Sequence, residues 1–273
     1  MNQEKDQLGT RMKLYEGILD ICLMPRLPII ARLDGRAFHT FTKGLSRPYD
    51  ERMSLCMVEL TKFLVGEFNA AVGYTESDEI SLVWLPQEDG AMMFNGRTAK
   101  INSVLAASAS VQFNRLVDRR IPSKSEHNAI FDCRVWNVPD LEEAANALLW
   151  REFDATKNSI SMAASAYYSP AELLNKNGSE KQEMLFQKGV NWNDYPPFFK
   201  RGSYIMPQII RRPFTVKEMD ELPPKHQARS NPDLQVERRE IIIVELPPLI
   251  KIQNRVGFLF QKEAPKLDEG VLP

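Results

Sequence analysis

Residues 27–39 read LPIIARLDGRAFH, and residues 70–85 read AAVGYTESDEISLVWL. In each stretch an apolar run typical of a strand meets acidic residues, Asp34 in the first and Asp78 and Glu79 in the second. The first motif ends its strand, whereas the second interrupts two short apolar segments, as the tip of a hairpin does. The two stretches therefore predict carboxylates at neighbouring strand ends.

Each motif alone also has an ordinary structural interpretation. Asp-Gly is a common turn dipeptide, and Ser-Asp-Glu can cap a turn or start a helix. The pairing of the motifs favours function, because two carboxylates beside a glycine whose backbone can approach a phosphate suit a magnesium nucleotide site. The sequence therefore predicts a two-metal site for nucleotidyl transfer.

The pattern of apolar residues predicts the other elements. From Asp50 to Phe68 apolar residues recur at helical spacing, and Asp50 and Glu51 favour the start of a helix. Residues 129–136 alternate as a strand does. The remaining expected elements are an amphipathic helix at 14–22, a strand at 26–33, hairpin strands at 70–74 and 80–85, helices at 99–119 and from Pro139 to about Tyr167, and a strand at 240–246.

The expected order, β-α-β-β-α-β with further helix, is the split βαβ topology of ferredoxin-like palms. We therefore predict an α+β fold in which an antiparallel sheet carries two helices on one face. Residues 1–206 are expected to form a palm-type catalytic domain with helical additions. Residues 207–273, which are rich in proline and alternating charge, are expected to form a C-terminal extension packed on this domain or on a neighbouring subunit.

Composition sets broad limits on the function. The chain has 273 residues, 43% of them hydrophobic, and a net charge of -1, which argues against nonspecific nucleic-acid binding but allows a local basic face. Cys22, Cys56 and Cys133 have no CxxC spacing and are expected to be buried thiols in a reducing compartment. With no apolar leader or membrane-length apolar run in this sequence, we expect a cytoplasmic protein without a membrane partner.

Further motifs accompany the two acidic ones between residues 26 and 205. In order, the set comprises RLDGRAFHTFT (32–42), RPYDER (47–52), GYTESDEISLVW (73–84), WREFDATKNS (150–159), KQEMLF (181–186) and GVNWNDYPPFFKRGSY (189–204). This series resembles the successive motifs of the tRNA-His guanylyltransferase superfamily. Several long motifs in one order are far more specific than a single short motif.

The resemblance implies an enzyme that adds nucleotides to the 5′ end of tRNA in the 3′-to-5′ direction. It implies that Asp34, the Gly35 carbonyl and Asp78 hold two Mg²⁺ ions, with Glu79 as a supporting catalytic carboxylate. Its substrates are GTP, ATP, which activates a 5′-monophosphate, and other nucleoside triphosphates. The implied nucleotide-binding residues are Arg32, Arg36, Ala37, Phe38, His39, Arg47, Asp50 and Ser77, and the implied contacts to tRNA or a second nucleotide are Asn158, Lys181 and Lys200.

One departure from the family pattern bears on the substrate. Thr156 stands where the eukaryotic branch has a histidine. The chain is therefore more similar to the bacterial, archaeal and phage-type guanylyltransferase-like proteins, for which the implied activity is template-dependent repair of 5′-truncated tRNA. The alternatives are a strict tRNA-His guanylyltransferase, a palm-type nucleotide cyclase and a non-catalytic tRNA-binding protein. By the same resemblance we expect a homotetramer.

Other reactive or aromatic side chains receive structural interpretations. His39 is read as a residue that shapes the site, because Mg²⁺ prefers oxygen ligands. His127 and His226 lack a partner at metal spacing and are expected at the surface. Trp136, Trp150 and Trp192 are expected to pack in the core, although each could stack on a base.

Overall fold

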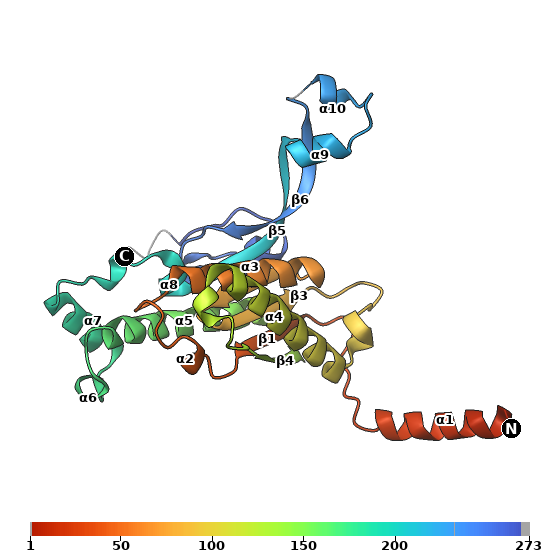
Figure 1. Ribbon diagram of the computed structural model, residues 1–273, viewed down its shortest axis with the longest axis horizontal. Helices are drawn as coiled ribbons and strands as arrows, with labels where there is room; N and C mark the ends of the chain where they lie inside the picture. The colour runs from red at the N-terminus through yellow and green to blue at the C-terminus, as the bar shows by residue number, and fades with distance from the viewer. Residues whose placement is uncertain (1, 232, 269–273) are drawn as a thin grey trace.

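The computed structural model describes residues 2–231 and 233–268, which form a sheet with helices on both faces (Figure 1). The sheet has six strands in the order β4-β1-β3-β2-β5-β6, and every neighbouring pair is antiparallel. The strands are β1 Ile29–Gly35, β2 Val72–Glu76, β3 Glu79–Trp84, β4 Phe131–Asn137, β5 Ser203–Pro213 and β6 Gln235–Val244.

The described helices follow the expected order, with additional short helices between them. No described helix has the length and apolar content needed to cross a membrane. The α-helices are α1 Asn2–Gly17, α2 Phe38–Phe41, α3 Glu51–Glu67, α4 Thr98–Arg120, α5 Leu141–Ser165, α6 Pro170–Leu173, α7 Gly178–Gln187, α8 Pro197–Arg201, α9 Val216–Glu221, α10 Gln227–Ser230 and α11 Arg255–Phe260. Four 3₁₀ turns are η1 Met93–Gly96, η2 Pro122–Lys124, η3 Trp192–Asp194 and η4 Leu249–Lys251.

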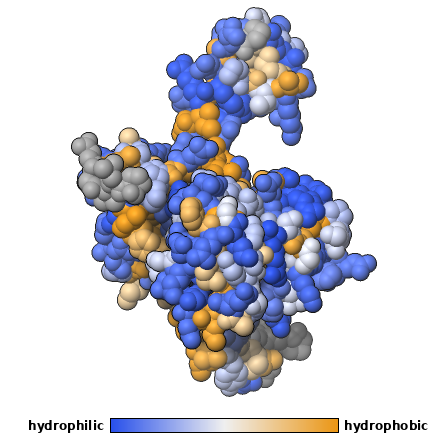
Figure 2. Space-filling model, turned by 90° about the vertical axis from the view of Figure 1, so that its left-hand side faces the viewer, coloured by the Kyte–Doolittle hydropathy of each residue, from blue (hydrophilic) through white to orange (hydrophobic). Residues whose placement is uncertain are grey.

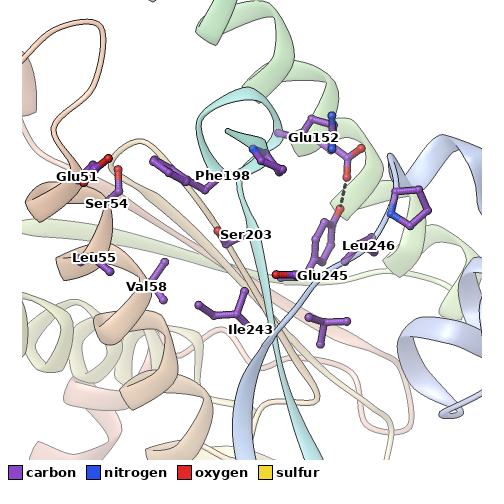
Figure 3. Close-up of a pocket in the computed structure, with 16 residues that line it drawn as sticks. Glu51, Ser54, Leu55, Val58, Glu152, Phe198, Ser203, Ile243, Glu245 and Leu246 are labelled. Atoms are coloured by element: carbon purple, nitrogen blue, oxygen red, sulfur yellow. Dashed lines mark hydrogen bonds between the residues drawn. The ribbon is translucent and has the colours of Figure 1, made fainter. Parts of the chain in front are cut away.

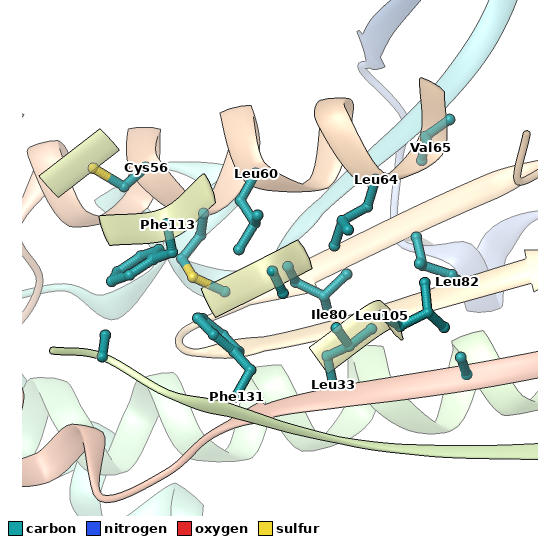
Figure 4. Close-up of a cluster of buried hydrophobic side chains, with 14 of the residues drawn as sticks. Leu33, Cys56, Leu60, Leu64, Val65, Ile80, Leu82, Leu105, Phe113 and Phe131 are labelled. Atoms are coloured by element: carbon teal, nitrogen blue, oxygen red, sulfur yellow. The ribbon is translucent and has the colours of Figure 1, made fainter. Parts of the chain in front are cut away.

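The predicted α+β palm is confirmed by β1, α3, β2, β3, α4 and β4, which occur in that order. Helices α3 and α4 cover one face of the sheet, as expected, and Figure 4 shows the apolar cluster between them and the strands. Leu33 and Ile80 point into this cluster from β1 and β3. Because strand side chains alternate between faces, Arg32 and Asp34 must point to the opposite face.

That opposite face is covered by α5 and α11. Ile30 and Tyr74 of the sheet belong to one buried cluster with Leu148 of α5 and Leu259 of α11. The apolar cover does not continue over the strand ends that carry Asp34, where the side chains are charged. The second face is therefore a packed core at one end and a polar site at the other.

The last two strands extend into a projecting arm. Beyond the sheet body, β5 and β6 continue as a two-stranded ribbon that carries α9 and α10 at its tip (Figures 1 and 2). Strand β5 was not expected from the sequence, because Pro207 lies within it. The proline is tolerated because β5 pairs with β2 only over residues 203–205, so one side of Pro207 lacks a neighbouring strand. The expected boundary between residues 206 and 207 lies inside this strand, and the division into 1–206 and 207–273 stays a prediction.

The N-terminal segment differs from expectation. The predicted helix at 14–22 is wrong in its bounds, because α1 ends at Gly17 and the following apolar residues Ile18 and Leu19 are exposed turn residues. Glycine commonly ends a helix. Cys22 was expected to be buried but is exposed, in an isolated bridge with Arg97.

Of the other two cysteines, Cys56 of α3 is buried as expected, whereas Cys133 on β4 is only half-buried. Burial raises the pKa of the Cys56 thiol to about 11 and that of the Cys133 thiol to about 12. Neither thiol is therefore ionised near neutral pH, which fits a packing role rather than a reactive one.

Candidate active site at the hairpin tip

The two acidic motifs meet at one edge of the sheet. Asp34, near the end of β1, is the register partner of Glu79, the first residue of β3. The Gly35 N–H donates a hydrogen bond to the carbonyl of Asp78 at 3.1 Å. Ser77 and Asp78 form the turn between β2 and β3, where Ser77 has φ 47° and its hydroxyl donates to Asp78 Oδ1 at 3.0 Å. The sequence prediction placed these carboxylates correctly on adjacent strand ends.

Two acidic side chains at this edge, Asp78 and Glu79, have raised pKa values. Burial raises the pKa of Asp78, and the nearby Asp34 carboxylate raises it further, against the hydrogen bond from Ser77. Burial also raises the pKa of Glu79, against the positive charges of Arg151 and Arg32. The Arg32 Nε atom lies 4.0 Å from Glu79 Oε1, which is too long for a hydrogen bond. Clustered, partly desolvated carboxylates of this kind are typical of functional sites.

A buried arginine on α5 was missed in the sequence. Arg151 Nη2 donates to Glu76 Oε1 at 3.0 Å and to Glu79 Oε2 at 2.8 Å, and its Nη1 donates to Asp154 Oδ2 at 2.8 Å. Burial and the neighbouring Glu79 raise the pKa of Glu76 to about 8, although Arg151 opposes this. A signal existed: Arg151 continues the buried stripe of α5 that includes Leu148, and an arginine in such a stripe needs buried acidic partners.

The turn after β1 is formed by a glycine and an anchored phenylalanine. A Cβ on Gly35 would lie 2.4 Å from the Phe38 ring, which is why only glycine fits there. Because the Phe38 side chain is buried, only its backbone could make the predicted contact with a nucleotide. The Arg36 N–H donates to the carbonyl of Ile130 at 2.8 Å and is occupied in this conformation. Ala37, with φ 56°, and His39 are exposed, and the first N–H groups of α2 have no acceptor within the helix.

Gly35→Ala is expected to destabilise the protein by about 1–3 kcal/mol, because the new methyl group overlaps the buried ring of Phe38. Nucleotide addition should fall as well, since the ring can yield only by moving the turn beside Asp34. Chemical denaturation and a steady-state assay would measure both effects. As a matched control, Gly178→Ala at the start of α7 meets nothing closer than 4.0 Å. Equal stability of the two variants would contradict the proposed overlap.

The loop before α3 is held by Asp50. Its side chain caps the helix, accepting from the Arg52 N–H at 3.0 Å, and also accepts from the Ser46 N–H at 3.2 Å and from the Arg52 guanidinium. The hydrogen bond from Arg52 lowers the pKa of Asp50 to about 2 despite burial. Arg47 is exposed in the same loop. Tyr49, in the same loop, packs against Phe198 and Phe199 of α8. The loop therefore contacts that helix.

The predicted tRNA contacts lie on α5, α7 and α8. Asn158 is exposed on α5, and Lys181 of α7 donates to Ser161 Oγ at 3.0 Å. Lys200 of α8 donates to the carbonyl of Asn193 and lies 5.6 Å from the ring centroid of Trp192. In the described part of the chain, no hydrogen bond or ion pair joins these three residues to Asp34 or Asp78, so the structure does not bring them directly onto the carboxylates.

The tryptophans and the other histidines divide between core and surface. Trp136 and Trp192 pack against buried clusters, as expected. The prediction for Trp150 is wrong, because its side chain is 52% exposed on α5 with the guanidinium groups of Arg151 and Arg32 at 4.7 and 5.9 Å from its ring. His127 is exposed, and the imidazole of His226 accepts from the Ala228 N–H.

A cavity of about 730 Å³ lies away from the hairpin tip, between α3, α8, β5 and β6 (Figure 3). Leu55, Val58 and Ile243 form apolar walls, and Glu152 lies at one end. The Glu152 carboxylate is occupied, because it accepts from the Tyr204 hydroxyl at 3.0 Å and from the Leu249 N–H at 2.8 Å. Neither Asp34 nor Asp78 lines this cavity.

The metal-binding capacity of the tip rests on a pair of carboxylates. Across residues 2–231 and 233–268, the side chains form no group of three or more His, Cys, Asp and Glu that could hold a metal alone. Mg²⁺, however, usually keeps several waters and binds one or two carboxylates together with substrate phosphates. Asp34 and Asp78, with oxygen ligands only, fit that mode and do not fit a fully protein-bound metal.

A palm sheet with carboxylates at the hairpin tip is an arrangement suited to metal-dependent chemistry on nucleotides. The sequence profile of the tRNA-His guanylyltransferase family matches residues 9–139. An uncharacterized protein of Acanthamoeba polyphaga mimivirus is 30% identical over 231 residues, which are 76% of this chain and 79% of that protein. The tRNA(His) guanylyltransferase of Saccharomyces cerevisiae is 28% identical over 201 residues, covering 67% and 84%.

Solved structures agree. A bacterial tRNA(His) guanylyltransferase (Thg1)-like protein in complex with ATP is 32% identical, with a TM-score of 0.76, over 93% of this chain and 98% of that chain. Its counterpart in complex with GTP has a TM-score of 0.70 at 32% identity, covering 90% and 94%. The chain therefore belongs to the tRNA-His guanylyltransferase superfamily, which confirms the resemblance and makes it a nucleotidyltransferase family member.

Proposed function

We propose that this protein adds nucleotides to the 5′ end of tRNA in the 3′-to-5′ direction, directed by the opposing strand of the tRNA. The observation that carries the proposal is the meeting of Asp34, Asp78 and Glu79 at one strand edge, in a chain of this superfamily. Support for the nucleotide substrates comes from the related bacterial proteins, whose structures contain ATP and GTP. The substrate tRNA is inferred from the names of the relatives.

In this proposal Asp34, Asp78 and the Gly35 carbonyl would hold two Mg²⁺ ions, together with the triphosphate. When bound, Mg²⁺ supplies charge neutralisation of the phosphates and a lowered pKa of the attacking 3′-hydroxyl. Glu79 adds negative charge beside Asp34, and in this proposal Arg32 pairs with a phosphate. The backbone amides of Ala37, Phe38 and His39 orient the triphosphate, and Ser77 holds Asp78 in position. No protein base is required.

The proposed reaction uses two transfers at the tRNA end. The 5′-monophosphate first attacks the α-phosphate of ATP or GTP and releases pyrophosphate, which leaves a nucleotidyl group on the 5′ end. The 3′-hydroxyl of the incoming nucleotide then attacks the 5′ phosphate of the tRNA and displaces this group as AMP or GMP. A 5′-triphosphate needs no activation. In this scheme Arg36, Ala37, Phe38, His39, Arg47 and Asp50 bind or order the first nucleotide, and Asn158, Lys181 and Lys200 contact the tRNA or a second nucleotide.

A strict tRNA-His guanylyltransferase, which adds a single G, is the second candidate, because the curated relatives include enzymes with that name. The identity of residue 156 favours templated repair, because Thr156 stands where the eukaryotic branch has a histidine. The Thr156 hydroxyl donates to the carbonyl of Glu152, one turn earlier in α5, at 3.0 Å.

A truncated tRNA distinguishes these candidates. With C opposite the missing nucleotide the protein should add G, and with A opposite it should add U, each about a hundredfold faster than the mismatched nucleotide. The reason is that a mismatch leaves base edges unpaired in a confined pocket. Primer-extension assays with each triphosphate in turn would measure this, and a preference for G at every template base would contradict templated repair.

Two controls in the same assay, one without tRNA and one with the truncated tRNA, test the remaining alternatives, a nucleotide cyclase and a non-catalytic tRNA-binding protein. Labelled GTP without tRNA should give no cyclic or joined product, whereas a nucleotide cyclase would form one. A non-catalytic tRNA-binding protein would bind the truncated tRNA and extend none of it. We further propose a cytoplasmic homotetramer in which the projecting arm of β5, β6, α9 and α10 contacts a neighbouring subunit. Analytical ultracentrifugation would measure the assembly state.

A further inference from the structure

We propose that Arg151 is a positioning residue for the hairpin tip, fixing Glu76 and Glu79 so that Asp78 and Glu79 are held facing Asp34. The inference rests on the proposed function, because it holds that Arg151 keeps the carboxylates of the proposed metal site in their positions. Arg151 itself contacts neither Asp34 nor Asp78 through any hydrogen bond or ion pair of the described residues. Its action is therefore indirect.

The first reason is the pairing of side chains at the base of the turn. Glu76 and Glu79 are cross-strand partners on either side of Ser77 and Asp78. One nitrogen of Arg151, Nη2, donates to both carboxyl groups, at 3.0 Å and 2.8 Å. The arginine thus joins the two strands through one bridge, which closes the turn carrying Asp78.

The second reason is that the guanidinium is itself immobilised. Its Nη1 donates to Asp154 Oδ2 at 2.8 Å, the Trp150 ring centroid lies 4.7 Å away, and only 7% of the side chain is exposed. A planar arginine fork with several fixed partners has little freedom to rotate. Arg151 therefore fixes the hairpin tip relative to α5. Glu79, which Arg151 holds, is the register partner of Asp34.

The positioning role and a purely electrostatic role predict opposite changes in metal affinity. Removing a positive charge beside carboxylates would, by electrostatics alone, tighten the binding of a cation. Releasing Glu76 and Glu79 from their shared partner would instead let the turn open and weaken binding. The affinity for a bare divalent cation therefore separates the two roles, without depending on the activity of the enzyme.

The test is a titration with Mn²⁺ alone, monitored by electron paramagnetic resonance. Arg151→Gln should weaken Mn²⁺ binding at least about tenfold, which is the size of effect common when a residue that orients a metal site from outside the ligand set is lost. Arg151→Lys keeps the charge without the fork, so it should fold and should still bind Mn²⁺ several-fold more weakly than the unaltered protein. Unchanged or tighter binding in Arg151→Gln, or full affinity in Arg151→Lys, would overturn the proposal.

Two further variants complete the design. Glu152→Gln alters the neighbouring buried residue of α5, whose partners are Tyr204 and Leu249, and should leave Mn²⁺ affinity unchanged. Asp34→Asn reports on the proposed function itself. If Asp34→Asn loses Mn²⁺ and Arg151→Gln does not, only the role of Arg151 is refuted. If Asp34→Asn binds Mn²⁺ normally, the metal site is refuted, and with it the positioning role. Should Arg151→Gln not fold, Arg151→Lys decides the question.

Discussion

Asp34→Asn and Asp78→Asn should each lower the rate of nucleotide addition at least about a thousandfold, because metal-dependent charge stabilisation supplies several kcal/mol to such reactions. The substitution keeps the volume of the side chain and removes only its charge. Both residues are partly exposed at a strand edge and outside the apolar clusters, so the fold should persist. Asp78→Asn also relieves the repulsion between Asp78 and Asp34 that raises the pKa of Asp78.

Single-turnover assays with a 5′-triphosphorylated truncated tRNA would measure the loss, and thermal melts would verify the fold. Asp140→Asn is the matched control, because Asp140 caps α5 and asparagine caps helices equally well. The control should retain its full rate. A near-normal rate in either site variant would remove that residue from the metal site.

Phe113→Ala should destabilise the protein by about 3–5 kcal/mol, the usual effect of deleting a buried aromatic ring. Phe113 of α4 is completely buried, and its ring centroid lies 5.4 Å from that of Phe38, 5.7 Å from that of Phe41 and 5.4 Å from that of Phe131. Figure 4 shows Phe113 and Phe131 pointing toward each other between α4 and the sheet. Loss of the ring also removes the support of Phe38, which anchors the turn after Gly35.

Calorimetry should therefore show a melting temperature lower by roughly 10 °C, the shift expected for this loss in a chain of this length. The matched control is Phe186→Ala on α7, where the phenylalanine is 67% exposed and leaves no cavity when truncated. A small shift in Phe113→Ala, similar to the control, would mean that the four rings do not form a rigid cluster. Activity of the Phe113 variant below its melting point should also fall, since the turn beside Asp34 loses its anchor.

The sequence by itself determined the secondary structure around the site. The helical spacing after Asp50 specified α3, and the alternation over 129–136 specified β4, because these periodicities are set by which face of an element is buried. Acidic residues that interrupt apolar runs marked the strand ends at Asp34 and Asp78. Such local signals sufficed to predict the palm and its carboxylates. They failed at α1, where exposed apolar residues imitate an amphipathic pattern.

Only the tertiary structure decided which side chains meet. Arg151 lies 75 residues from Glu76 and 72 residues from Glu79 in the sequence, and nothing in the spacing of one motif indicates its partners in another. Trp150 is exposed although it precedes a buried arginine, because α5 presents its next residue to the sheet. Strand β5 likewise depends on β2 and β6 as neighbours. Contacts of this kind follow from long-range packing, which has no period along the chain.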